Sequence, residues 1–212
     1  MLQACLRTIM AAVLIGSSGR ALAAPIGAPA SEVATREAVD EIDALLAGAV
    51  QVGFGGAVII QRGDEVLLAE GYGFADRGAR TPFTTSTVAQ IGSITKSQTG
   101  AAIAALVAQG KVALHEPLSR YVPEAPEPGA SRTIAQLLAH GSGLLDVCGD
   151  DFDPMPETKL IADCLARPLA HPVGEDHYSN TGYSALALVV QRVTGKPWEE
   201  AVRELVWQPL GL

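Results

Sequence analysis

Residues 91–109 read IGSITKSQTGAAIAALVAQ, a polar, glycine-containing start that runs into an alanine-rich segment. The alanine-rich segment predicts a helix over 94–109, and Gly110 is well placed to end it in a left-handed conformation. Ser93 precedes Lys96 by three residues at the start of this helix. Taken alone, such a pair is more often a capping serine beside a solvated lysine than a reactive site.

The spacing nevertheless permits chemistry. A serine hydroxyl is a weak nucleophile and needs a base that takes its proton. Residues three apart lie on one face of a helix, so Lys96 is within side-chain reach of Ser93. A buried lysine with a lowered pKa can act as that base. The free N–H groups and the positive dipole end at the start of the helix point toward any oxyanion that forms near Ser93.

A second polar stretch, Tyr178-Ser179-Asn180, lies 85 residues after Ser93 and just before another predicted helix. A tyrosine whose hydroxyl meets the lysine can relay protons between a nucleophile and a leaving group. An asparagine offers a donor and an acceptor to a substrate amide. The alternative interpretation of this stretch is a helix start with Asn180 as the N-cap residue.

Three motifs in this order resemble those of the serine β-lactamase-like hydrolases, which include cephalosporinase-type β-lactamases, D-Ala-D-Ala carboxypeptidases and related esterases. The motifs are SITK (Ser93–Lys96), LLAHGSGL (Leu137–Leu144) and YSN (Tyr178–Asn180). Two supporting phrases are also similar, GKVALHEPLSRYVP (Gly110–Pro123) and QPLGL (Gln208–Leu212). The resemblance implies an α/β (α+β) fold with a helical region and an antiparallel sheet.

The resemblance also implies a role for each matching residue. Ser93 would attack a carbonyl and become acylated, and Lys96 would accept or share its proton. Tyr178 would act with Lys96 as general base and then as acid toward the leaving group, while Asn180 would hold a substrate amide or the lysine. The implied reaction is acyl transfer on a β-lactam, a D-amino-acid peptide or an ester, without a cofactor. The alternative is a non-catalytic penicillin-binding or sensor module that retains the fold.

One part of the family pattern is missing. The third motif, K-T-G or H-x-G on a strand of the main sheet, does not occur; Thr194-Gly195-Lys196 has the letters in another order. We therefore expect residues 35–212 to be the N-terminal portion of such a domain, truncated so that the C-terminal strands are missing. We also expect this chain to have little or no activity by itself.

The N-terminal residues predict an exported protein. Arg7, an apolar stretch over 8–16 and the A-x-A pattern at 21–23 are typical of a signal peptide covering residues 1–23, followed by a linker over 24–34. Its removal would change the formal charge from −8 to −10, and an acidic chain is a poor nucleic-acid binder. No later segment is long and apolar enough to cross a membrane. We expect a periplasmic or secreted location, a small-molecule or peptide substrate, and leave the oligomeric state open.

Periodicity and turn residues predict the remaining elements. Ser31 can cap a first helix, whose apolar face includes Val39 and Ile42. The other predicted elements are strands over 57–61 and 65–70 with a turn at 62–64, a glycine-rich loop over 71–82, and helices over 133–140, 180–193 and from Pro197 to about 206.

Two cysteines outside the predicted signal peptide, Cys148 and Cys164, can either pair in an oxidising compartment or remain free thiols. No histidine lies near them at zinc-ligand spacing, so we expect no metal site there. The acidic residues Asp150, Asp151 and Asp153 lack calcium-loop spacing and indicate a solvated loop.

Overall fold

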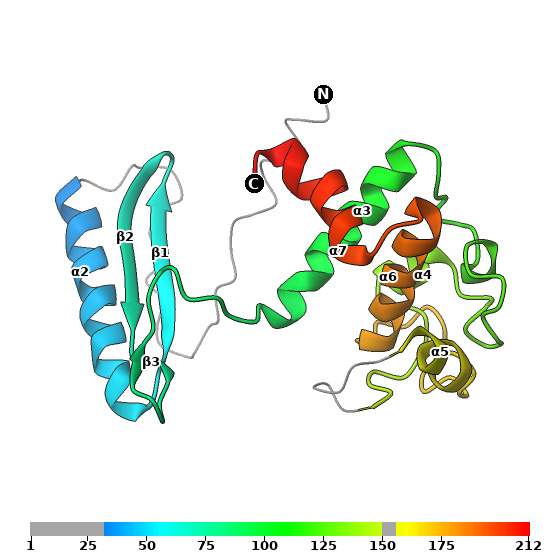
Figure 1. Cartoon of the computed structure of the whole chain (residues 1–212), viewed down its shortest axis with the longest axis horizontal. Coiled ribbons are helices and arrows are strands. Elements are labelled where there is room, and N and C mark those ends of the chain that lie inside the picture. Colours follow the sequence, from blue (N-terminus) through cyan, green and yellow to red (C-terminus); the bar gives the residue numbers. More distant parts are fainter. Residues whose placement is uncertain (1–31, 150–155) are drawn as a thin grey trace. The chain divides into compact units, whose positions relative to one another are not determined.

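The structure, a computed structural model, describes residues 32–149 and 156–212, and Figure 1 traces their helices and strands. The predicted signal peptide, most of the predicted linker and the Asp150–Asp153 loop lie outside the described residues. The chain divides into two compact units, with the boundary between Val88 and Ala89. We describe each unit by itself.

The first unit is built around a β-hairpin. Strands β1 (Gly56–Arg62) and β2 (Glu65–Tyr72) pair antiparallel, and Gly63 in the turn has a φ of 59°. Both strands and the turn agree with the prediction from sequence, because the β-branched run Val58–Ile60 favours a strand and a glycine tolerates the left-handed turn position. Helix α2 (Glu32–Ala49), which includes residues assigned above to the linker, packs on β2.

The predicted loop over 71–82 is partly a second small sheet, in which β3 (Phe74–Asp76) pairs antiparallel with β4 (Thr81–Pro82). Gly71 and Gly73 allow the backbone before β3 to pass close to neighbouring segments, Gly71 beside Phe83 and Gly73 beside Phe54. A Cβ added at Gly71 would lie 2.2 Å from the Phe83 carbonyl oxygen, so only glycine fits there. The glycines that suggested a loop instead allow the backbone to approach closely and pair.

The second unit is helical. Its main helices are α3 (Thr95–Ala108), α4 (Ile134–Leu138), α6 (Asn180–Thr194) and α7 (Trp198–Val202). The shorter turns are η2 (Gly92–Ile94), η3 (Leu118–Arg120), α5 (Glu157–Lys159), η4 (Leu160–Cys164), η5 (Arg203–Trp207) and η6 (Gln208–Leu210), while η1 (Val50–Val52) follows α2 in the first unit. The helices predicted near residues 94, 133, 180 and 197 are therefore all present.

The start and end signals of these helices have the expected partners. The Thr133 side chain accepts from the Gln136 N–H, and the Gln136 side chain accepts from the Thr133 N–H, which forms a capping box at the start of α4. Helix α6 ends at Gly195, whose φ is 69°. Gly110, after α3, has a φ of 70°. In each case a glycine occupies the left-handed position that other residues disfavour.

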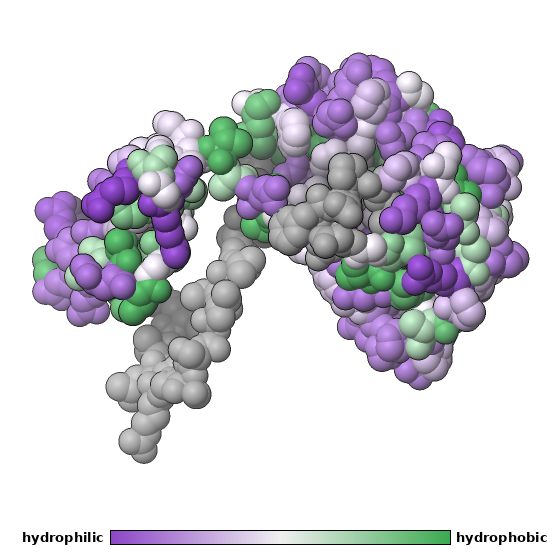
Figure 2. Space-filling model, turned by 60° about the horizontal axis from the view of Figure 1, so that its bottom comes forward, coloured by the Kyte–Doolittle hydropathy of each residue, from purple (hydrophilic) through white to green (hydrophobic). Residues whose placement is uncertain are grey.

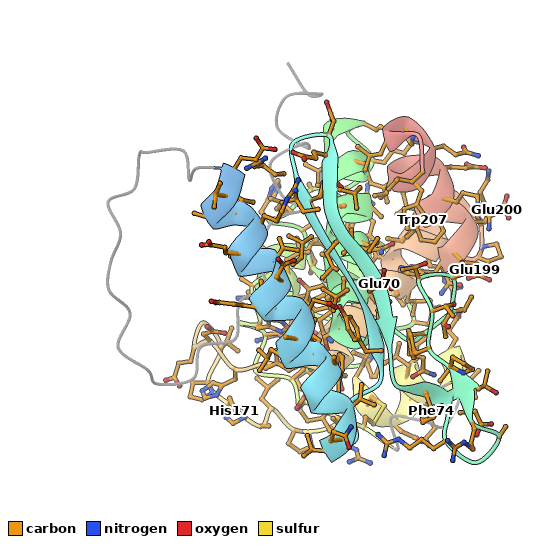
Figure 3. All side chains as sticks on the ribbon, turned by 90° about the vertical axis from the view of Figure 1, so that its left-hand side faces the viewer. Glu70, Phe74, His171, Glu199, Glu200 and Trp207 are labelled. Carbon is orange, nitrogen blue, oxygen red and sulfur yellow. A yellow bond between two sulfur atoms is a disulfide. The ribbon has the colours of Figure 1, made fainter. Side chains whose placement is uncertain are left out.

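The core of the helical unit comes from the apolar faces of α3, α4, α6 and α7. Its most buried members are at most 1% exposed: Ala102, Ile103, Leu106, Leu118, Val122, Ile134, Leu137, Leu144, Cys164, Leu165, Ala185, Leu186, Val189, Val190, Ala201 and Val202. Two indoles fix the last helices to α3, since Trp198 Nε1 donates to Thr99 Oγ1 at 3.2 Å and Trp207 Nε1 donates to Gln98 at 2.6 Å (Trp207 is labelled in Figure 3). On the visible face of this unit, hydrophilic residues surround small hydrophobic patches (Figure 2).

Cys148 and Cys164 form a disulfide, with Cα atoms 5.6 Å apart. This bond settles the alternative that the sequence left open. It ties the loop after α4 to the end of η4, and both sulfur-bearing residues are buried. Among the described helices, none combines the length and the apolar character that a membrane crossing requires.

Candidate active site

Ser93 and Lys96 lie where a short 3-10 turn runs into α3. Ser93 belongs to η2, and the α-helix begins two residues later at Thr95. A 3-10 turn has three residues per turn, so positions three apart still share a side. Lys96 Nζ donates to Ser93 Oγ at 3.2 Å. Gly92 has a φ of 51°, a conformation that glycine adopts at little cost just before the serine.

Tyr178 approaches the same serine from the start of α6. Its hydroxyl oxygen lies 2.7 Å from Ser93 Oγ. The neighbouring Ser179, rather than Asn180, is the N-cap of α6, and its Oγ accepts from the Gly182 N–H at 3.0 Å. Ser179 Oγ also donates to the Leu145 carbonyl at 2.9 Å. Because Ser179 is buried and held on both sides, the residues before and after it have fixed positions.

Two oxygens and two aromatic rings surround the Lys96 ammonium, and the more distant ring, that of Tyr183, has its centre 5.7 Å from Nζ. Lys96 Nζ donates to Ser93 Oγ and to Asn180 Oδ1, and it lies 4.8 Å from the centre of the Tyr178 ring. An ammonium has three N–H donors and is attracted by the face of an aromatic ring. The two oxygens and the Tyr178 ring therefore provide a partner for each donor.

The imidazole ring of His140 stacks on the ring of Tyr178, with their centroids 4.5 Å apart. His140 Nδ1 accepts from the Ser179 N–H at 3.1 Å, as expected for a turn histidine that bonds to the backbone. Burial lowers the pKa of His140, and the charge of Lys96 lowers it further, against the opposing effect of Asp176 and Asp146. The ring is therefore neutral near pH 7, with its proton on Nε2.

The acidity of Tyr178 results from opposing effects. Burial raises the pKa of its phenol, but the hydrogen bonds and charge of Lys96, together with the hydroxyl of Ser93, lower the pKa below its usual value overall. Burial raises the pKa of nearby Tyr183, which donates to the Leu138 carbonyl at 3.0 Å. Of these two phenols, that of Tyr178 is the more acidic.

The structure thus brings Ser93, Lys96, Tyr178 and Asn180 into one hydrogen-bonded cluster, and their catalytic roles remain predictions. It adds a residue that sequence reasoning did not single out, Asp146, whose carboxylate accepts from Asn180 Nδ2 at 3.0 Å. The only signal in the sequence is its position two residues after the LLAHGSGL motif, which does not indicate a partner 34 residues away. Within the described ranges, no group of three or more His, Cys, Asp or Glu residues is arranged to hold a metal ion.

A nucleophile, an amine and a phenol that meet at the start of a helix, in an α+β chain, define a class of candidate acyl-transfer proteins. Residues 42–212 match the family model described as Beta-lactamase, and the chain belongs to this family. The fold class and the family expected from the sequence motifs are thereby confirmed.

Named relatives are hydrolases and a penicillin-binding protein. The chain is 33% identical to Esterase EstB of Burkholderia gladioli, over 74% of this chain and 45% of that protein. It superposes on a D-amino acid amidase of Ochrobactrum anthropi SV3, solved with D-phenylalanine, with a TM-score of 0.69 and 29% identity over 82% of this chain and 50% of the other. It superposes on a penicillin-binding protein of Bacillus halodurans with a TM-score of 0.65 and 29% identity, over 84% of this chain and 54% of the other. The chain spans between 38% and 45% of the length of the first curated relatives that it matches.

Proposed function

We propose that this chain carries the nucleophile of a serine hydrolase that works through an acyl-enzyme on Ser93. One observation supports the proposal above the others: Ser93 Oγ lies within hydrogen-bond distance of both Tyr178 Oη, at 2.7 Å, and Lys96 Nζ, at 3.2 Å. A serine hydroxyl with a base on one side and a cation on the other is an activated nucleophile.

In the proposed reaction, Ser93 Oγ forms a bond to the substrate carbonyl carbon while its proton passes to the phenolate oxygen of Tyr178. Lys96 stabilises that phenolate before the transfer. The carbonyl oxygen becomes an oxyanion, and the Ser93 N–H in the first turn, where N–H groups lack helical partners, would donate to it. The bond to the leaving group then breaks, and Tyr178 Oη returns the proton to the leaving atom. Water releases the acyl group in a second cycle of the same transfers.

The proposed substrates are esters, D-amino-acid amides or peptides, and β-lactams, since each has a carbonyl that this attack requires. An esterase, a D-amino acid amidase and a penicillin-binding protein among the similar proteins support this range. We also propose an exported location, periplasmic or secreted. The disulfide between Cys148 and Cys164 supports it, because such bonds persist in oxidising compartments.

Intact-mass spectrometry after exposure to a fluorophosphonate and, separately, to a penicillin tests the proposal. One covalent adduct on Ser93 is expected, with none on Ser93→Ala. Ser97→Ala is a matched control, because Ser97 lies one helical turn on and its hydroxyl donates to the Ile94 carbonyl at 2.7 Å. Absence of any Ser93 adduct on the folded chain would contradict the proposal. A penicillin adduct that forms and is never released would favour the alternative, a binding or sensor module.

A further inference from the structure

The Asp146 carboxylate holds two N–H groups of Asn180. Asp146 Oδ1 accepts from Asn180 Nδ2 at 3.0 Å and from the Asn180 backbone N–H at 3.2 Å. The Asp146 carbonyl accepts from Thr181 N at 3.0 Å and from Thr181 Oγ1 at 3.2 Å. Through these four bonds, the loop that follows α4 reaches the first residues of α6.

The contact with Asn180 Nδ2 fixes which way the side-chain amide faces. An amide has a donor end and an acceptor end, whereas an ionised carboxylate only accepts. Asp146 therefore binds the NH2 end, which leaves Oδ1 directed at Lys96 Nζ. In the flipped orientation, the NH2 group would meet the Lys96 ammonium as donor against donor, and the carboxylate would meet the amide oxygen as acceptor against acceptor.

We propose that Asp146 is a positioning residue of this site, which acts through Asn180 to hold Lys96 beside Ser93. The inference rests on the proposed function, because it assigns a role within that site. Lys96 has a long flexible side chain, and Asn180 Oδ1 is one of the two oxygens that hold its Nζ. An amide that rotates freely would release the ammonium from that anchor. Lys96 would then occupy its position beside Ser93 and Tyr178 for less of the time.

A purely structural role for Asp146 predicts something different. The bonds to the Asn180 and Thr181 backbone belong to the start of α6, where they satisfy N–H groups that lack helical partners. If these bonds were its whole contribution, changing Asp146 would lower stability and would affect the site equally whether or not Asn180 were present.

Asp146→Asn separates the two roles. The new amide keeps an acceptor for the Asn180 backbone N–H, the main-chain carbonyl still binds Thr181, and the preference for one orientation of the Asn180 amide is lost. We expect acylation of Ser93 by a fluorophosphonate to slow about tenfold, in line with the loss of one charge-assisted hydrogen bond, with an unchanged thermal unfolding midpoint. Asp176→Asn is the matched control. Asp176 also acts electrostatically on this site through His140 but does not bond to Asn180, so the acylation rate should stay the same.

The same substitution in the Asn180→Ala background gives the decisive comparison. In the Asn180→Ala background, Asp146→Asn should not change the acylation rate further, because the side-chain amide through which Asp146 acts has been removed. A tenfold loss in both backgrounds, or an unchanged rate in the unaltered background, would overturn the inference.

The side-chain amide signals of Asn180 in a ¹H–¹⁵N spectrum, assigned by their loss in Asn180→Ala, give a readout independent of activity. An asparagine amide gives two proton signals whether or not it is bonded, because its C–N bond rotates slowly. In the unaltered chain we expect the proton bonded to Asp146 to be shifted downfield and to exchange with water more slowly than its partner. Ordinary shifts and fast exchange for both protons would overturn the inference even if Asp146→Asn failed to fold. If the unaltered chain forms no Ser93 adduct but shows the shifted, slowly exchanging proton, the proposed function fails while the positioning contact stands.

Discussion

The two units of this chain bury their apolar residues to very different extents. In the described part of the first unit, Tyr72 is the only buried apolar side chain, while Leu45, Val52 and Ile59 are more than half exposed. The helical unit encloses a continuous core shared by four helices. Because burial of apolar surface is the main source of folding free energy, most of the stability should come from the helical unit. The candidate site lies in that same unit.

The two units also differ in the acidity of one tyrosine in each, Tyr72 and Tyr178. The Tyr72 hydroxyl donates to Asp43 at 2.6 Å, and this hydrogen bond, with burial and the nearby carboxylates, raises the pKa of Tyr72 to about 12. Tyr178 faces an ammonium instead, and its pKa falls below the usual value. The two phenols therefore differ in acidity because one lies beside a carboxylate and the other beside an ammonium.

Replacing the two tyrosines in turn should give the largest difference between the units. Tyr178→Phe removes the proposed base, so the rate of Ser93 acylation should fall about 10²- to 10⁴-fold, the usual range for loss of a general base. Tyr72→Phe should leave this rate unchanged. Single-turnover acylation with a penicillin measures both. Equal rates for Tyr178→Phe and the unaltered chain would contradict the role of the phenol.

A pair of leucine truncations compares stability. Leu106→Ala empties a fully buried position on α3 and should lower the free energy of unfolding by about 2–5 kcal/mol. Leu45→Ala, the same change at an α2 position that is 71% exposed, should cost less than about 0.5 kcal/mol. Urea denaturation followed by circular dichroism measures both. Similar losses would show that the first unit contributes to stability as much as the second.

The disulfide offers a perturbation confined to the helical unit. Replacing both Cys148 and Cys164 by serine opens a loop with a sequence separation of 16, which should cost about 3 kcal/mol. Hydrogen exchange should become faster in α6, while the amides of the β1–β2 hairpin keep their protection. Loss of protection in the hairpin as well would show that the two units unfold together.

A pH titration of the tyrosines should show a smaller effect, a difference between the pH values at which Tyr178 and Tyr72 ionise. With absorbance at 295 nm, Tyr178 should ionise at a lower pH than Tyr72, and each step should vanish in the corresponding phenylalanine variant. The rate of Ser93 acylation should rise with pH as Tyr178 loses its proton. A reversed order of ionisation would contradict the assigned partners.

The raised pKa of Tyr72 also has a consequence for stability. Because the folded state holds this proton more tightly than the unfolded state, the stabilisation is fully present below pH 10 and is lost as pH rises through about 12. Asp43→Asn should reduce that dependence, which alkaline unfolding experiments can measure.

Sequence reasoning was most successful where the signal is local. The helix after Ser93 and the left-handed Gly110 that follows it are predicted from periodicity and end signals within a few residues. The cluster of Ser93 with Tyr178 was also expected, but only because several motifs occur together in one family. The spacing of 85 residues does not itself predict a contact.

The features that could not be predicted from the sequence depend on contacts between residues far apart along the chain. Asp146 is one of several acidic residues near a loop, and its importance comes from bonds that form only when this loop and α6 are folded. The glycines around the β3–β4 pair predict a loop, and strands of three and two residues are too short to show an alternating pattern, so only the pairing of Phe74 with Pro82 and of Asp76 with Thr81 reveals the second sheet. The pairing of Cys148 with Cys164 required the geometry of the folded chain.

The division of the site between two helices has a consequence for experiments on folding. Ser93 and Lys96 lie at the start of α3, whereas Tyr178 and Asn180 lie at the start of α6, and these helices pack together in the core. Contacts so distant along the chain form late and are costly in loop entropy. On our proposal, a molecule reacts with a covalent probe only after these helices have docked. The fraction of protein labelled at Ser93, measured at successive times of refolding, would therefore equal the fraction of native molecules.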